Sequence, residues 1–280
     1  KTNLQGKPSG SSCAHSFGKG FQAMTFDSNT NLGKWPFKYL ELDSPSNLEK
    51  KFKALGITKA LVGNLEGLFH TDIVGVNQRL VDWCANIKEV HFFPSGSINP
   101  TLTGWQMDLD DCKTKFHMRS IRLHPNYHGY DLQDPRFVML LEKAASGGLL
   151  VQIVLRMEDE RTQHPLLRIQ PVDLKPLVEA IAKVPSAKVQ LLNTNQDILS
   201  QTSMALARSK RVFFDIASLE GTQSLPKVIR SLGIHALCLG THAPLFVPES
   251  ALLKIHEGNL QKEEENLIRF GNMEQILSAS

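Results

Sequence analysis

Polar side chains that could do chemistry stand at or just after several short apolar runs of this chain. Asn29 and Asn31 accompany the first run, His124 and His128 follow the fourth, and His242 follows the last. A histidine titrates near neutral pH, so it can transfer a proton or bind a metal ion. An asparagine amide can hydrogen-bond a substrate. These residue types therefore predict a site for acid–base or metal chemistry on a small polar molecule.

Charged candidates accompany later runs. Arg156 follows the fifth run and is itself followed by Glu158 and Asp159, Asn193 follows the sixth, and Asp215 ends the seventh. The guanidinium fork of an arginine can hold a carboxylate or an oxyanion, and one of the two neighbouring acids could orient it. Asp215 could orient the histidine that follows the last run. Structural roles remain open for all of them, such as turn capping or ion pairs within a solvated loop.

Eight β-branched runs recur at intervals of about thirty residues, with helical patterns between most of them. Strands that alternate with helices predict a parallel sheet, and eight such units predict a (β/α)8 TIM barrel, whose active sites lie after the carboxyl ends of the strands. The predicted strands are 23–26, 59–62, 90–98, 119–123, 149–155, 188–192, 212–216 and 236–239. The predicted helices are 45–55, 72–87, 135–145, 174–184, 196–208 and 225–232.

The loop after the first run carries Trp35 and Phe37, which we expect to pack over the mouth of the barrel. Tyr127 lies between the two histidines that follow the fourth run. The loops after the fourth and fifth runs are long, whereas returning loops such as 56–58 are short. In a barrel that asymmetry marks the functional end.

Composition and charge favour small-molecule chemistry. The 280 residues are 41% hydrophobic and 21% charged with a net charge of +3, and the basic residues form no stripe, which argues against nucleic-acid binding. We expect a polar N-terminal arm over 1–22 and one barrel domain over 23–280. No apolar run approaches membrane-spanning length, so the prediction is a soluble protein without membrane partners.

Four cysteines lack the spacing of a metal motif or a disulfide scaffold, which predicts reduced and mostly buried thiols: Cys13, Cys84, Cys112 and Cys238. The chain opens on Lys1 rather than on Met. A cytoplasmic location and export after loss of an upstream segment therefore both remain open. The sequence does not define the oligomeric state, and a homo-oligomer is one of the options.

Three strings placed on this frame resemble the amidohydrolase superfamily, in particular its branch of amidohydrolase-2-like barrel hydrolases. The string 27–31 (Asp-Ser-Asn-Thr-Asn) stands where that family has Asp-x-His-x-His. The string 240–244 (Gly-Thr-His-Ala-Pro) stands where the family has Gly-Ser-Asp-x-Pro, and 266–272 resembles the closing helix with its Gly-Asn pair. The resemblance spans most of the chain and implies a TIM-barrel hydrolase.

The departures from the family pattern fall on its metal ligands. Asn29 and Asn31 replace the two histidines of the first strand, and His242 replaces the aspartate of the eighth. Arg156 and Asn193 stand where the family often has histidine. An amide oxygen is a weak neutral ligand for a transition metal, since zinc favours imidazole, thiolate or carboxylate. The resemblance therefore implies a divergent member that lacks the usual metal site.

The first functional hypothesis is a hydrolase that cleaves an ester, lactone or amide of a small polar and carboxylated molecule, without a metal. In it, His242 is the general base, and Arg156 with His124 or His128 stabilises the oxyanion. The residues predicted to contact the substrate are Asn29, Asn31, Trp35, Tyr127, Glu158, Asp159 and Asn193.

Two other hypotheses remain open. One keeps a single divalent ion, zinc or manganese, on a relocated set of ligands drawn from His124, His128, Glu158, Asp159 and His242. Three ligands of such a set would suffice for a catalytic metal with an open position. The other is a non-catalytic barrel that binds a sugar or a metabolite, because fold alone does not establish activity.

Overall fold

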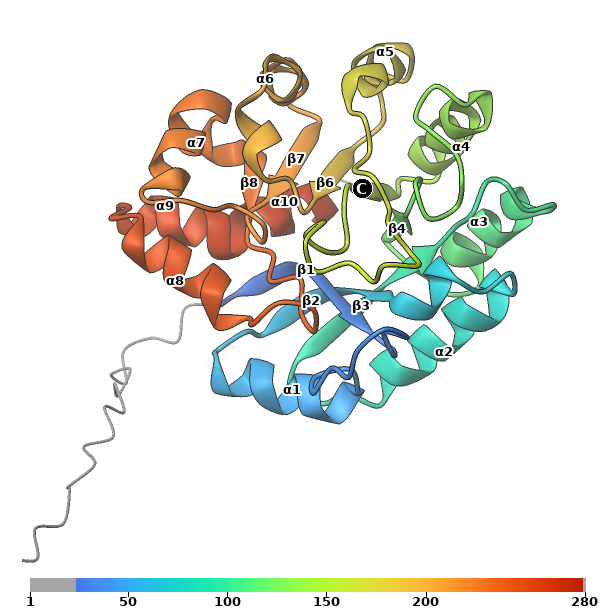
Figure 1. Ribbon diagram of the computed structural model, residues 1–280, viewed down its shortest axis with the longest axis horizontal. Helices are drawn as coiled ribbons and strands as arrows, with labels where there is room; N and C mark the ends of the chain where they lie inside the picture. The colour runs from blue at the N-terminus through green and yellow to red at the C-terminus, as the bar shows by residue number, and fades with distance from the viewer. Residues whose placement is uncertain (1–23, 279–280) are drawn as a thin grey trace, which may run out of the picture.

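The computed structural model describes residues 24–278, apart from the side chain of Gln196 (Figure 1). The arm expected over 1–22 and Cys13 lie outside the described residues. Eight strands, each hydrogen-bonded in parallel to the next, follow one another in chain order around the sheet. The strands are β1 (Phe26–Leu32), β2 (Lys59–Asn64), β3 (His91–Ser97), β4 (Ser120–Leu123), β5 (Leu150–Val154), β6 (Val189–Leu192), β7 (Val212–Asp215) and β8 (Leu237–Cys238).

Backbone hydrogen bonds between the first strand and the segment after β8 close the sheet into a barrel. The Ser28 amide donates to the Leu239 carbonyl at 2.8 Å, and the His242 amide donates to the Asn29 carbonyl at 2.7 Å. Thr30 and Ala243 form an isolated parallel bridge further along the same seam. The (β/α)8 TIM barrel that the periodicity predicts is therefore confirmed.

Helices surround the barrel (Figure 1). The α-helices are α1 (Pro45–Ala54), α2 (Ile73–Ala85), α3 (Trp105–Thr114), α4 (Pro135–Ser146), α5 (Lys175–Lys183), α6 (Gln201–Arg208), α7 (Ser224–Leu232), α8 (Glu249–Glu257), α9 (Lys262–Asn266) and α10 (Asn272–Ser278). Short 3-10 helices are η1 (Leu65–Leu68), η2 (Gln196–Leu199) and η3 (Ile234–Ala236), and η4 (Leu267–Gly271) is a π-helical turn.

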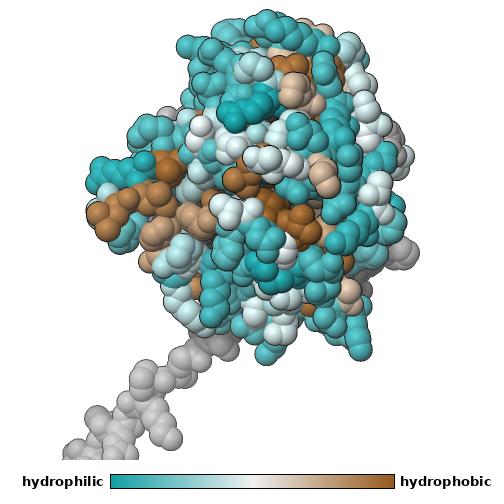
Figure 2. Space-filling view, turned by 90° about the vertical axis from the view of Figure 1, so that its right-hand side faces the viewer, coloured by the Kyte–Doolittle hydropathy of each residue, from teal (hydrophilic) through white to brown (hydrophobic). Residues whose placement is uncertain are grey.

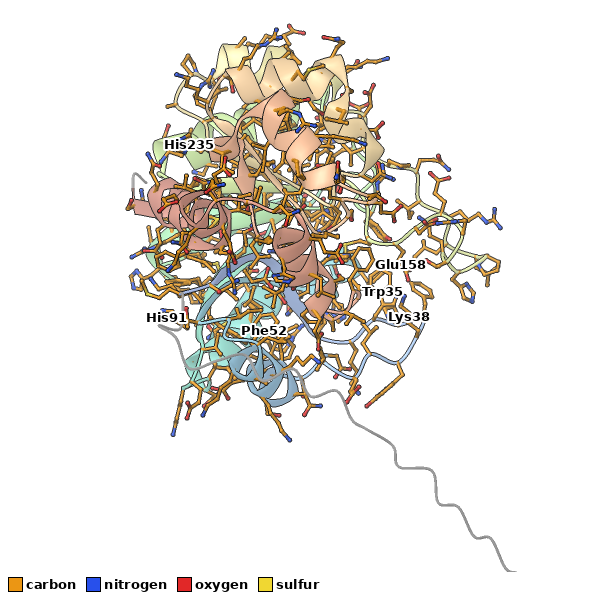
Figure 3. The ribbon with its side chains drawn as sticks, turned by 90° about the vertical axis from the view of Figure 1, so that its left-hand side faces the viewer. Trp35, Lys38, Phe52, His91, Glu158 and His235 are labelled. Atoms are coloured by element: carbon orange, nitrogen blue, oxygen red, sulfur yellow. The ribbon has the colours of Figure 1, made fainter. Side chains whose placement is uncertain are left out.

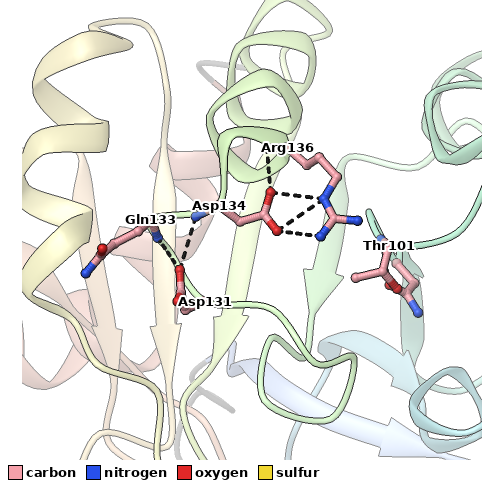
Figure 4. Close-up of polar contacts among 6 residues, drawn as sticks. Thr101, Asp131, Gln133, Asp134 and Arg136 are labelled. Carbon is pink, nitrogen blue, oxygen red and sulfur yellow. Dashed lines mark hydrogen bonds and ion pairs between the residues drawn. The ribbon is translucent and has the colours of Figure 1, made fainter.

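Local sequence signals explain where several helices begin. Ser44 accepts a hydrogen bond from the Asn47 amide at the start of α1, and Pro45 occupies its first turn, as predicted. Asp134 caps α4 by accepting from the Arg136 amide at 2.9 Å, and its carboxylate also pairs with the Arg136 guanidinium (Figure 4). Such caps satisfy backbone amides that lack a partner inside the helix.

Two predicted boundaries are wrong and one helix was missed, each for an identifiable reason. The first strand begins at Phe26, where it was predicted to end, because its polar residues hide the strand pattern. The predicted helix 196–208 is interrupted at Ser200, whose hydroxyl caps α6 by accepting from the Ser203 amide at 3.2 Å. Helix α3 was not predicted, although Trp105 and Leu109 are buried one turn apart.

The interior of the barrel is unusually polar. Branched apolar residues commonly fill such barrels. Here the fully buried interior residues include Ser28, Ser95, Arg122, Gln152 and Gln190. The Gln152 amide donates to the Ser28 carbonyl and to Gln190 Oε1, each at 2.8 Å, and Gln190 donates to the Ser28 hydroxyl at 2.7 Å. Satisfied networks of this kind offset the cost of burying polar groups.

The amino-terminal end of the barrel is closed by an apolar layer. Phe26 and Leu150 pack there with Met273 and Ile276 of the C-terminal helix α10. Phe26 also stacks on Phe93 with ring centroids 5.6 Å apart. Because side chains fill this end, we place the candidate site at the carboxyl ends of the strands.

The described cysteines are buried, and one face of the surface is mostly hydrophilic (Figure 2). Cys84, Cys112 and Cys238 are free and buried, as predicted, and burial raises the pKa of the Cys84 thiol to about 12. Between residues 24 and 278, no helix combines the length and apolar composition that crossing a bilayer requires. Figure 2 shows a largely hydrophilic face with apolar side chains at its left-hand edge and in its centre.

Candidate active site

The loop after β1 covers the mouth of the barrel. Its Trp35 ring is only 4% exposed and packs edge-on against Phe37 and Tyr127, with centroids 5.7 and 6.3 Å away. Phe69, from the loop after β2, contacts the same indole at 5.7 Å. The prediction that Trp35 and Phe37 pack over the mouth is therefore confirmed.

One ion pair fastens this loop to the opposite side of the mouth. The Lys38 ammonium lies 2.6 Å from Glu158 Oε1, and the Glu158 side chain is only 5% exposed (Figure 3). Lys38 follows β1, whereas Glu158 follows β5. Glu158 therefore pairs with Lys38 of the covering loop and not with Arg156, its predicted partner.

A cluster of amides and a carboxylate lies beneath the loops. Asn29 on β1 donates through Nδ2 to Asp215 Oδ2 at 2.6 Å and to Asn193 Oδ1 at 2.7 Å. The backbone N–H of Asn193 donates to Asp215 Oδ1 at 2.8 Å. All three side chains are nearly inaccessible to solvent. Burial raises the pKa of Asp215 to about 6, and the bonds from Asn29 and Asn193 oppose that rise.

Both ring nitrogens of His242 have hydrogen-bond partners. Its Nε2 lies 2.8 Å from the Met157 carbonyl, which can only accept, so Nε2 carries the proton. Its Nδ1 lies 3.2 Å from Asn193 Nδ2, a donor. Burial lowers the pKa of the ring to about 4. Asn193 thus stands between Asp215 and His242, where the sequence predicted a direct contact, and the ring has no free nitrogen with which to act as a general base.

His124 differs from His242 because both of its ring nitrogens lack a hydrogen-bond partner among the described residues. The side chain is 2% exposed, and burial lowers its pKa well below the usual value, with His128 and Arg122 acting in the same direction. His128 bonds the Gly67 carbonyl through Nε2 at 2.9 Å, which leaves Nδ1 as an unpartnered acceptor. The two rings, 6.0 Å apart, therefore present neutral nitrogens without partners.

Arg122 is a central residue that the sequence analysis did not select. It is fully buried, and its Nη1 donates to the Thr30 carbonyl and to Asn31 Oδ1, each at 2.7 Å. Its Nε donates to Gln152 Oε1 at 3.0 Å. Asn31, predicted to contact the substrate, instead positions this guanidinium. A charged residue inside the apolar run 119–123 was the signal that could have identified it.

Asp27 ties the first strand to the segment after β8. Its carboxylate accepts from the Thr241 amide at 3.0 Å, from the Thr241 hydroxyl at 2.5 Å and from the Asn29 amide at 3.0 Å. Burial raises the pKa of Asp27 to about 7, and these hydrogen bonds oppose the rise. The carboxyl group therefore holds the backbone that precedes His242.

The remaining charged candidates form ion pairs other than the predicted ones. Arg156 is an ion-pair partner of Asp197, with Nη2 3.3 Å from Oδ2, while its Nε is buried without a partner. Asp159 pairs with Arg161 at 2.7 Å. The prediction that Glu158 or Asp159 orients Arg156 is therefore wrong.

The residues at the family's metal positions do not fit a metal ion. Asn29, Asn193 and His242 bind one another or their neighbours, and a guanidinium such as Arg156 has no lone pair to offer. The relocated ligand set is not assembled either, because Glu158 and Asp159 are paired with basic residues. Within residues 24–278, no three His, Cys, Asp or Glu side chains lie together as a metal site.

Comparison with known proteins supports the fold. No family and no curated protein matches the sequence. The 5-carboxyvanillate decarboxylase of Sphingomonas paucimobilis superposes with a TM-score of 0.70 at 12% identity, covering 92% of this chain and 100% of its own. The 2,6-dihydroxybenzoate decarboxylase of Rhizobium gives 0.69 at 11% identity, with 91% and 98% covered.

A Staphylococcus aureus protein described as a candidate amidohydrolase gives a TM-score of 0.71 at 9% identity, with 91% of this chain and 99% of that one covered. A 5-carboxyvanillate decarboxylase of Novosphingobium aromaticivorans, with a TM-score of 0.70, 12% identity and coverages of 92% and 96%, was solved with manganese and a nitrobenzoic acid. At these identities the likeness establishes the shared fold. The resemblance to amidohydrolase-type barrels is thus confirmed for the architecture.

Proposed function

We propose that this chain is a metal-independent enzyme of the amidohydrolase type that hydrolyses an ester, lactone or amide bond of a small carboxylated molecule. The observation that carries the proposal is His124, a buried neutral imidazole at the carboxyl end of β4 with two unpartnered ring nitrogens. Active sites of TIM barrels lie at this end of the strands. A neutral imidazole can accept a proton from water without a metal ion.

In this proposal the base is His124 rather than His242. A ring nitrogen of His124 takes a proton from water while the water oxygen attacks the carbonyl carbon of the substrate. The buried Nε of Arg156 has no partner of its own and donates to the negative charge that forms on the carbonyl oxygen. When the carbonyl re-forms, the C–O or C–N bond to the leaving group breaks, and the proton on His124 passes to the leaving oxygen or nitrogen. His242 and Asn193 hold the Met157 and Arg156 carbonyls in place, so they position the loop after β5.

The charge of the substrate is inferred from Arg122. This fully buried guanidinium donates to neutral groups, namely the Thr30 carbonyl, Asn31 Oδ1 and Gln152 Oε1, and none of these acceptors is a carboxylate. A carboxylate near this guanidinium would gain electrostatic stabilisation. The decarboxylases of similar fold act on carboxylated aromatic molecules, which fits a carboxylated substrate but leaves the bond that breaks untested.

The test is turnover of a panel of carboxylated esters, lactones and amides, with 2,6-dihydroxybenzoate and 5-carboxyvanillate added as decarboxylation substrates. His124→Gln should lower kcat at least a hundredfold on any hydrolysed substrate, because general base catalysis contributes about 10²–10⁴. His235→Gln, at an exposed position far from the mouth, is the matched control (Figure 3). Release of CO₂ without hydrolysis would show a decarboxylase and would overturn this proposal.

A non-catalytic binding barrel is the second candidate. The hydrogen bonds of His242 favour this candidate. His242 stands at the position of the family's catalytic aspartate, and both of its ring nitrogens are bonded, one to the Met157 carbonyl and one to Asn193. If calorimetry detects binding of panel members that neither wild type nor His124→Gln turns over, this second candidate replaces the enzyme.

A further inference from the structure

The Trp35 indole lies where a ligand of a TIM barrel would be expected. It belongs to a buried apolar cluster at the mouth, whose members come from the ends of several strands. The cluster contains Trp35, Leu40, Leu65, Leu68, Val154, Met157 and Leu192, with Tyr127 and Leu245 packed against it. Ligands of such barrels bind among the loops that follow the strands. The chain itself therefore fills this place with a planar ring.

The indole is poorly satisfied there. Its Nε1 is buried and has no hydrogen-bond partner within the described residues. A buried tryptophan N–H usually has an acceptor, and an unsatisfied buried donor disfavours the state that contains it. Trp35 thus lacks a feature expected of a permanent core residue.

The fastening of the loop depends on an ion pair with one exposed partner. It joins Lys38, whose side chain is 42% exposed, to Glu158, whose side chain is 5% exposed. The Lys38 ammonium is already partly in water, so it can leave the pair without a large change in its own solvation. Beyond it, the Phe37 ring stacks on His164 of the loop after β5, with centroids 5.3 Å apart, and Phe37 is itself 36% exposed.

We propose that the Trp35 indole is a displaceable plug, and that the mouth binds a small carboxylated molecule with a planar ring that takes the place of the indole. This inference rests on the proposed function for the charge of the ligand. The ring would pack against Tyr127 and Phe69, as the indole does. Breaking the Lys38–Glu158 pair releases the loop and opens the mouth.

The first test uses indole itself as the probe, measured by calorimetry. Trp35→Ala should bind indole at least tenfold more tightly than wild type, because the plug no longer competes. Lys38→Met should bind it severalfold more tightly than wild type, and Lys34→Met, an exposed residue of the same loop, should match wild type. Equal affinities for wild type, Trp35→Ala and Lys38→Met would overturn the proposal. If Trp35→Ala fails to fold, Lys38→Met decides alone.

The second test follows the plug in the protein with Trp83 and Trp105 replaced by Phe, which leaves Trp35 as the only tryptophan. Benzoate should shift its fluorescence to longer wavelength as the ring moves into water, whereas acetate should not. An unchanged spectrum at saturating benzoate would contradict the displacement. Neither test needs turnover, so a failure of the hydrolase proposal would leave these results interpretable.

Discussion

The side-chain amide of Asn29 donates to the Asp215 carboxylate over 2.6 Å and so links the first and seventh strands inside the barrel. The same amide nitrogen also reaches Asn193 Oδ1, after β6, at 2.7 Å. Direct hydrogen bonds between side chains therefore order this part of the mouth.

Metal content follows directly from this arrangement. Protein purified without chelators should contain far less than one zinc, manganese or iron ion per chain by plasma mass spectrometry. EDTA should leave the melting temperature unchanged, because no metal contributes to folding in the way that a structural site does. About one ion per chain, lost together with stability on chelation, would show that the described side chains rearrange to bind it.

The pH dependence of stability should reveal Asp27. Its pKa is about 7 in the folded protein and 3.8 in the reference state, so between these values the folded protein binds the extra proton. The contribution of Asp27 to stability should therefore fall as pH rises from about 4 to about 7, by up to about 4 kcal/mol. Other buried groups titrate in the same range, so the measured quantity is the difference between variant and wild type in urea denaturation. The stability of wild type relative to Asp27→Asn should fall across this range, whereas its stability relative to the exposed Asp82→Asn should stay constant.

His242 should act with the opposite sign. Its pKa is about 4 when folded and 6.5 in the reference state, so the unfolded chain binds the extra proton between these values. The contribution of His242 to stability should therefore fall as pH decreases from about 6.5 to about 4, by up to about 3 kcal/mol. Because Asp27 acts in the opposite direction over this range, the test is again a difference. The stability of wild type relative to His242→Gln should fall by that amount on acidification. A difference that does not change with pH would mean that the ring is more accessible than the structure indicates.

Most of the barrel could be predicted from the sequence, because apolar strands such as 149–155 alternate with amphipathic helices and this alternation is visible in the residue pattern. The prediction failed at β1, since Asn29 and Asn31 break the apolar pattern although they lie within the strand. The site was predicted in part. Strand-end position identified His124 and His242, but it could not distinguish the free ring from the saturated one.

Partners across the barrel are the part that a single sequence does not contain. Arg122 and Gln152 are 30 residues apart, and their contact depends on the register of β4 and β5. The Lys38–Glu158 pair joins residues 120 positions apart. The conformations of the loops decide which lysine meets which acid, and the order of charges along the sequence allows many such pairings.

Arg122 should be the most sensitive residue of the interior. Replacement by Met removes the guanidinium and leaves the Thr30 carbonyl, Asn31 and Gln152 without their donor. Breaking a buried charged network by removing one member costs about 3–5 kcal/mol. Chemical denaturation of Arg122→Met should show a loss of that size, while the exposed Arg119→Met should stay within about 0.5 kcal/mol of wild type. Comparable stabilities for the two variants would exclude a structural role for Arg122.

Asn193 should control the His242 ring without setting its tautomer. Asn193→Ala removes the bonds to the Arg156 carbonyl and to His242 Nδ1 but keeps the backbone amide that donates to Asp215. Loss of buried hydrogen bonds should cost about 1–3 kcal/mol. In ¹⁵N NMR, Nε2 of His242 should stay protonated, because the Met157 carbonyl still accepts from it, whereas the Nδ1 resonance should shift. A switch of the proton to Nδ1 would show instead that Asn193 dictates the tautomer, and it would free Nε2 to act as a base.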